Sequence, residues 1–172
     1  MNNAIEGLMQ DLLGSAPGPV PQSTQDQFHQ VAQQAPTGAL AQGIQAAFNS
    51  EQTPPFGAMV AHMFGQANPD QKAGIVNRLL AGLGPSAGTL LSRLGLPGTT
   101  PQSPFAVPSL TTDQATGLQP GQVEQIASQA QATNPGIVQT MSNFYAQHPV
   151  LVKTLGAVAL SAILSNIRSG SR

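Results

Sequence analysis

The chain has no cysteine and no tryptophan, and Tyr145 is the only tyrosine among its 172 residues. The lack of cysteine excludes disulfide bonds, thiolate metal ligands and cysteine nucleophiles. Because phenylalanine, with six residues, is the only other aromatic type, a hydrophobic core must be built mainly from Leu, Ile, Val, Ala and Met.

Charged residues are also scarce. Asp, Glu, Lys and Arg make up only 8% of the sequence, whereas they make up about 25% of an ordinary soluble domain. The chain has 21 glutamines, which replace charges on its polar helix faces. The six basic residues form no patch, and a nucleic-acid binder needs several of them to neutralise phosphates. The sequence therefore predicts no nucleic-acid partner, and a net charge of −1 leaves little repulsion between copies of the chain.

No motif in the sequence indicates catalysis, metal binding or cofactor binding. The three histidines are scattered, and no spacing matches a zinc or calcium site. Gly84-Pro-Ser-Ala-Gly88 fits the G-x-S-x-G pattern of α/β-hydrolases, in which the serine follows a strand. Residues 75–83 are helical in pattern, so we interpret Ser86 as a helix N-cap. We predict no catalytic residue, no metal ligand and no cofactor.

Apolar residues recur at intervals of three and four along the chain, and prolines interrupt the pattern. No run of alternating β-branched residues is present, so the pattern predicts an all-α fold with about eight short helices. Thr24 followed by Gln27 fits a capping box, and Asn68-Pro69 is a strong helix start. The last helix is expected to begin at His148-Pro149 and to end near Ile167.

Proline-rich stretches predict the domain organisation. An N-terminal amphipathic helix at 1–15 is followed by a spacer at 16–22, a first helical unit at 23–96, a linker at 97–109 and a second helical unit at 110–172. Residues 28–35 resemble residues 123–130, so two similar three-helix units are one interpretation. The other is that any helical protein rich in glutamine and alanine produces such matches.

The N-terminal helix carries one apolar stripe opposite Glu6, Gln10 and Asp11. Its spacing of i, i+3, i+4, i+7 and i+8 is typical of a helix that buries one face. Such a short helix is unstable alone in water, so it must dock on its own chain or on a neighbouring copy. We predict self-association through this arm, with the spacer giving it reach; the stripe consists of Ile5, Leu8, Met9, Leu12 and Leu13.

Two other apolar stripes allow two interpretations each. The first is either ordinary core or an interface, and it consists of Phe56, Met59, Val60, Met63 and Phe64. The second lies in residues 150–167, which contain one charge and approach the minimum length of a membrane span. It is either a buried core helix, which the grouping of its polar residues on one sector favours, or a membrane-surface anchor; its apolar residues include Leu151, Leu155, Val158, Ile163 and Ile167.

The first residues include Glu6 and Asp11, where a signal peptide would have a basic region and an apolar run. We therefore expect a cytoplasmic location, with envelope association as an alternative. The expected function is that of a non-enzymatic structural or scaffold protein whose partner is itself, in a homo-oligomer or a filament. The alternatives are a helical protein at a membrane surface and a helical binder of a small ligand or peptide.

Overall fold

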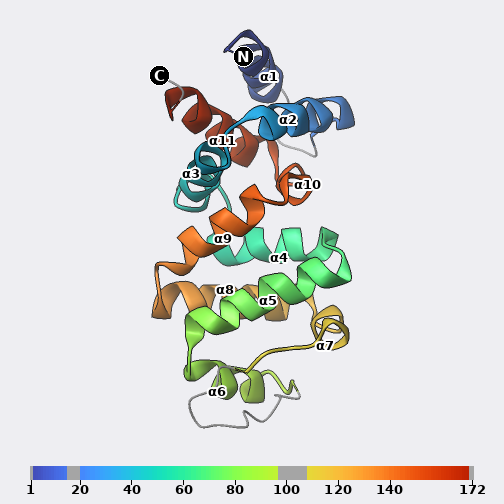
Figure 1. Ribbon diagram of the computed structural model, residues 1–172, viewed down its shortest axis with the longest axis vertical. Coiled ribbons are helices and arrows are strands. Elements are labelled where there is room, and N and C mark those ends of the chain that lie inside the picture. The colour runs from blue at the N-terminus through green and yellow to red at the C-terminus, as the bar shows by residue number, and fades with distance from the viewer. Residues whose placement is uncertain (1, 15–19, 97–107, 171–172) are drawn as a thin grey trace. The chain divides into compact units, whose positions relative to one another are not determined.

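The computed structural model describes residues 2–14, 20–96 and 108–170 (Figure 1). This part of the chain contains eleven helices and no strand, which confirms the all-α prediction. The number of helices exceeds the expected eight or so, partly because two very short helices are present, α7 (Thr112–Thr116) and α10 (Pro149–Val152).

The helices group into two compact units that differ from the division expected from the sequence. The terminal unit combines Met1–Pro55 with Ser142–Arg172, and the central unit is Phe56–Met141. The expected boundary at 97–109 falls inside the central unit, because the helices before and after it pack together. The boundary on the C-terminal side falls within one continuous helix, α9 (Ile137–Ala146).

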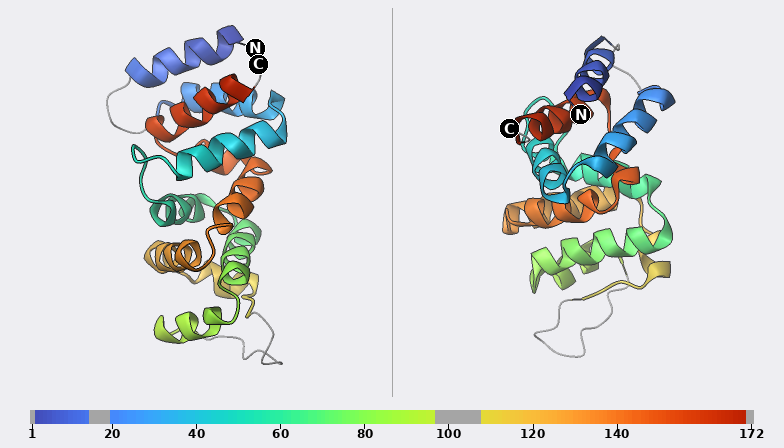
Figure 2. Two further views of the ribbon diagram at one scale, coloured as in Figure 1. Left: turned by 90° about the vertical axis from the view of Figure 1, so that its left-hand side faces the viewer. Right: turned by 45° about the horizontal axis from the view of Figure 1, so that its top comes forward.

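The terminal unit is built around the last helix, α11 (Ala157–Gly170), which packs against both α1 (Asn2–Gly14) and α3 (Thr37–Phe48). Figure 2 shows α11 between these two N-terminal helices. Helix α2 (Gln22–Gln34) contacts α1 and α10. The contact between α3 and α11 is close because Gly43 lacks a side chain: a Cβ at Gly43 would lie 2.8 Å from the carbonyl oxygen of Ile163.

The central unit pairs α8 (Pro120–Thr133) with α4 (Phe56–Gln66) and α5 (Pro69–Leu83). Helix α6 (Ser86–Arg93) and α7 both contact α5. Asn77 on α5 fixes the chain just before α7, since its side chain donates to the carbonyl of Leu110 at 3.1 Å and accepts from the Leu110 N–H at 2.8 Å.

The helix start predicted at Asn68 is confirmed, whereas the caps predicted at Thr24 and Ser86 are wrong. The side chain of Asn68 accepts a hydrogen bond from the Gln71 N–H at 2.8 Å, and the Gln71 side chain accepts one from the Asn68 N–H at 3.1 Å. Pro21 and Pro85, rather than Thr24 and Ser86, occupy the N-cap positions of α2 and α6. Helix α2 therefore begins at Gln22, before Thr24, and α6 begins at Ser86 itself, so neither predicted residue is the cap.

We expect Gly43→Ala to lower the free energy of unfolding by about 1–3 kcal/mol, because the added methyl group forces α3 away from the backbone of α11. Gly38→Ala in the same helix is the matched control, since nothing lies within 4 Å of its Cβ position. Removing this glycine from a helix should leave stability unchanged or raise it by up to about 1 kcal/mol. Urea denaturation measures both values, and equal values for the two variants would contradict the close contact.

Candidate functional site

The N-terminal stripe docks on its own chain. Ile5 and Leu8 are buried, with 2% and 1% of their surfaces exposed, in the terminal unit where α1 contacts α11 and α2. Met9 is half-buried, and the side chains of Leu12 and Leu13 lie outside the described part of the structure. The Arg168 Nη1 atom on α11 lies 3.7 Å from the Glu6 Oε1 atom, and this ion pair faces the solvent.

Among the side chains of α1 that the structure describes, Ile5 and Leu8 are buried and Met9 is half-buried. Burying two such side chains contributes about 3–6 kcal/mol before the cost of ordering the helix is subtracted. The exposed Glu6–Arg168 pair adds no more than about 1 kcal/mol. By comparison, α11 buries Ala159, Leu160, Ile163, Leu164 and Ile167.

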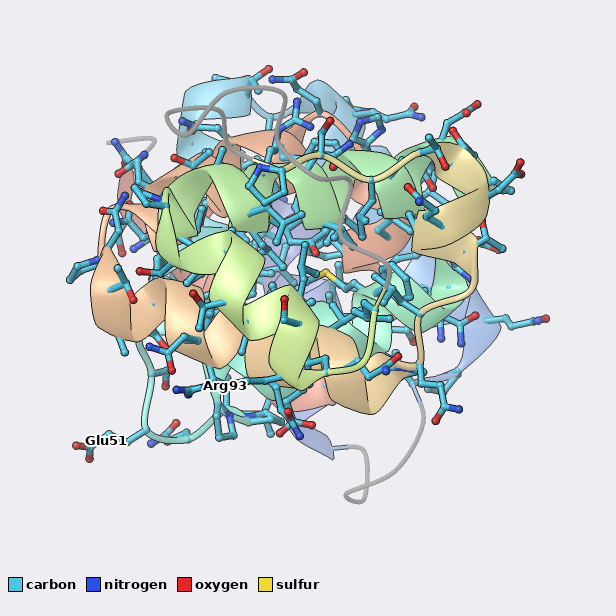
Figure 3. The ribbon with its side chains drawn as sticks, turned by 90° about the horizontal axis from the view of Figure 1, so that it is seen from below. Glu51 and Arg93 are labelled. Carbon is cyan, nitrogen blue, oxygen red and sulfur yellow. The ribbon has the colours of Figure 1, made fainter. Side chains whose placement is uncertain are left out.

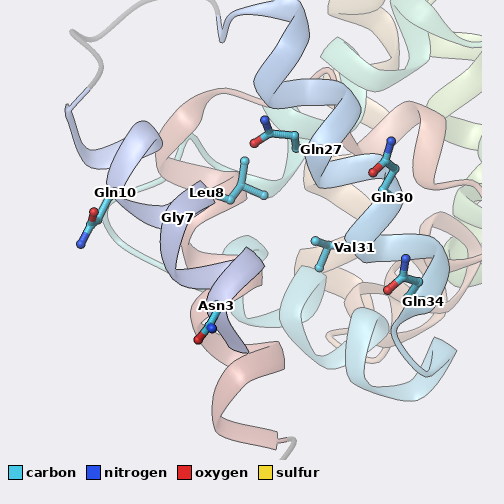
Figure 4. Close-up of a pocket in the computed structure, with 8 residues that line it drawn as sticks. All are labelled: Asn3, Gly7, Leu8, Gln10, Gln27, Gln30, Val31 and Gln34. Carbon is cyan, nitrogen blue, oxygen red and sulfur yellow. The ribbon is translucent and has the colours of Figure 1, made fainter. Parts of the chain in front are cut away.

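A cleft of about 550 Å³ separates α1 from α2. Figure 4 shows Leu8 of α1 and Val31 of α2 on facing sides of this cleft, with Gln30 and Gln34 along the α2 rim. The other lining residues are Asn3, Gly7, Gln10 and Gln27. None of the eight lining residues is titratable and five are carboxamides, so the cleft is polar but uncharged.

The apolar stripe on α4 lies in the core of the central unit. Each of its five side chains has at most 2% of its surface exposed, in a helix that packs against α8; these are Phe56, Met59, Val60, Met63 and Phe64. In this position the stripe leaves no apolar surface for a second molecule, so it serves as packing.

The last predicted helix is interrupted, which corrects the expectation of one helix from Pro149 to Ile167. Helix α10 ends at Val152 and α11 begins at Ala157. The Thr154 hydroxyl and its backbone N–H both donate to the Leu151 carbonyl, at 2.6 and 3.2 Å, in a tight turn that follows α10, and Gly156 is a poor helix former. Leu151, Leu155, Ile163 and Ile167 are buried, whereas Val158 is 50% exposed.

No helix in the part of the chain that the structure describes combines the length and apolar character needed to cross a membrane. Residues 150–167 approached that length only if they formed a single helix. Because the helix is interrupted at 153–156, these residues do not form a single helix of that length.

A second ion pair joins the two chain ends within the terminal unit. Lys153, which follows α10, places its Nζ atom 3.8 Å from Oδ1 of Asp26 on α2. Both ion pairs therefore connect the first 26 residues to the C-terminal segment. Exposed pairs contribute about 0–1 kcal/mol each, so they add little to the stability of the terminal unit.

Tyr145 is the most unusual buried residue. Its ring packs edge-on against Phe48 and Phe144, with centroid distances of 6.0 and 5.5 Å. The Tyr145 hydroxyl is buried, and no group among the described residues forms a hydrogen bond with it. Burial raises the pKa of the Tyr145 phenol well above its usual range, because the tyrosinate would be desolvated. The sequence identifies Tyr145 as the only tyrosine but contains no signal for this environment.

The described residues offer little for metal chemistry or hydrolysis. No group of three or more His, Asp or Glu side chains within the described ranges could hold a metal ion. Ser86 is the first residue of α6 and follows helix α5 rather than a strand. The geometry that exposes the serine of a G-x-S-x-G turn in α/β-hydrolases is therefore not formed at Gly84–Gly88.

Comparisons of the chain with protein-family models, with curated proteins and with solved structures found no significant match.

The unpaired hydroxyl predicts an unusual alkaline titration. Tyr145 is the only tyrosine, so tyrosinate absorbance measures its ionisation alone. Burial raises the pKa of Tyr145 in the folded state, so the contribution of the neutral phenol to the free energy of unfolding is complete below the unfolded pKa of about 10. Above that pH, this contribution falls by about 1.4 kcal/mol per pH unit. We expect tyrosinate to form only together with the loss of helical circular dichroism. Tyrosinate formation near pH 10 in a fully helical protein would contradict the burial.

Tyr145→Phe is the matched variant for that titration. It removes an unsatisfied buried hydroxyl, so we expect the free energy of unfolding at neutral pH to rise by about 1–2 kcal/mol. The variant should also keep its helical structure to higher pH than the parent chain. A loss of stability greater than about 1 kcal/mol would mean that the hydroxyl has a hydrogen-bond partner.

Proposed function

We propose that the protein is a non-enzymatic interaction protein that associates with copies of itself by exchanging helix α1. The observation that carries this proposal is the docking of α1, a thirteen-residue terminal helix whose described side chains Ile5 and Leu8 are buried against α11 and α2. A helix of this length is unstable alone in water, so it stays folded only while it is docked, on its own chain or on a copy.

The connection to the rest of the chain favours exchange. The sequence from Gly14 to α2 contains Pro17, Pro19 and Pro21, and proline-rich segments act as extended, semi-rigid spacers. This sequence supports the proposal that α1 can reach either its own α11 or the α11 of a neighbouring copy. The contacts made by Ile5, Leu8 and Glu6 are the same in both cases, so the exchange costs little enthalpy.

The composition of the surface also favours association. Only thirteen residues carry a charge, so two copies approach with little repulsion. Exposed glutamines hydrogen-bond water or a second protein equally well. Reciprocal exchange between two copies closes a dimer, whereas exchange along a row of copies continues into a filament.

Cysteine pairs test the exchange directly, because the chain contains no cysteine of its own. Glu6→Cys and Arg168→Cys place one thiol each on α1 and α11, at a contact where the original side chains lie 3.7 Å apart. When the two single variants are mixed and treated with a short bis-maleimide, we expect a covalent dimer that contains one copy of each. Mass spectrometry identifies this dimer, and light scattering of the parent chain should show dimers or larger species at micromolar concentrations.

Glu51→Cys mixed with Arg168→Cys is the control for random collision. Glu51 is exposed, follows α3 rather than lying on α1, and points away from the helices (Figure 3), so this mixture should give little cross-linking. A chain that begins at residue 16 should be smaller in solution than a dimer. The proposal is wrong if the mixed single variants give no cross-linked dimer and the parent protein stays monomeric. In that case the double variant Glu6→Cys/Arg168→Cys would cross-link only within single chains.

A further inference from the structure

We propose that the cleft between α1 and α2 binds an extended, uncharged peptide segment through its main chain. The cleft volume of about 550 Å³ lies in the range of ligand sites in proteins. The site needs α1 in its docked position, whichever copy supplies that helix, so it does not depend on exchange.

The chemistry of the lining residues defines the ligand class. Asn3, Gln10, Gln27, Gln30 and Gln34 each carry a carboxamide, which offers two N–H donors and a carbonyl acceptor on neighbouring atoms. A peptide group has the complementary acceptor and donor. No lining residue could neutralise a charge, and an unpaired ion would lose part of its hydration there. The cleft therefore favours uncharged partners.

The spacing of three carboxamides matches an extended chain. Gln27, Gln30 and Gln34 lie on one face of α2 at i, i+3 and i+7, which covers about 10 Å along the helix. Three residues of an extended peptide cover the same length. All three glutamines are exposed, and no protein group within the described ranges hydrogen-bonds their side chains. These carboxamides are therefore available to a ligand.

The base of the cleft is apolar. Leu8 and Val31 face each other across it (Figure 4). Leu8 is almost fully buried, so the half-buried Val31 offers the apolar surface for one side chain of the peptide. Gly7 has nothing within 4 Å of its Cβ position, which keeps the α1 side open. No aromatic residue lines the cleft, and a sugar ring would need such a flat surface to stack upon. The lining thus fits a peptide better than a saccharide.

Nuclear magnetic resonance with the full chain labelled with ¹⁵N tests the site. The probe is the peptide Ser-Leu-Ser-Leu-Ser, acetylated and amidated so that it carries no charge, and maltose is titrated separately. We expect the peptide to shift the side-chain amide signals of Gln27, Gln30 and Gln34, and maltose to leave them unchanged. No shift with the peptide, or shifts with maltose instead, would overturn the proposal.

Two variants of α2 separate this site from the rest of the helix. Gln30→Ala/Gln34→Ala should weaken peptide binding about tenfold or more, because two hydrogen-bonding groups are lost. Gln33→Ala is the matched control, since Gln33 is on α2 but does not line the cleft, and it should bind the peptide as the parent chain does. Equal binding by all three proteins would place the peptide elsewhere. Light scattering of each sample reports its oligomeric state, so failure of the exchange and failure of this site give different results.

Discussion

The packing of α11 against the N-terminal helices is the interaction on which the terminal unit depends. It joins residues more than a hundred positions apart in the sequence, and it is possible because Gly43 allows the backbone of α11 to approach α3. The same helix then provides the surface on which α1 docks. A long-range contact of this kind carries a large loop-closure cost, so it must be well packed, and the five buried apolar side chains of α11 provide that packing.

Helix α11 contacts α3 on one side and α1 on the other. The α3 side is closely packed at Gly43, and on the α1 side the described contacts include the buried Ile5 and Leu8 and one exposed ion pair. The chain also carries few charges, so two copies repel each other less than two ordinary domains do. The proposed exchange and the proposed peptide site both follow from the position of α1: one uses its release, and the other uses the cleft that it forms when docked.

Periodicity and proline positions were sufficient to predict the all-α class and most helix starts from the sequence. The capping box at Asn68 was predictable because it is local, involving residues three apart. The two units were not predictable, since their boundaries depend on which distant helices pack together, and the linker composition at 97–109 indicated a different division. The interruption between α10 and α11 was not predicted, because the apolar spacing continues across the turn at Thr154. The cleft was invisible to sequence patterns because two separate helices form it.

Hydrogen exchange of backbone amides, measured helix by helix, tests the central claim most directly. If α1 leaves its docking site on an otherwise well-packed unit, its amides must open without unfolding α3 or α11. The account predicts that the free energy of opening for the second half of α1 lies several kcal/mol below that for α11, in line with the estimated docking energy. Equal opening free energies in α1 and α11 would mean that the N-terminal helix is an integral part of the core, and would contradict the account.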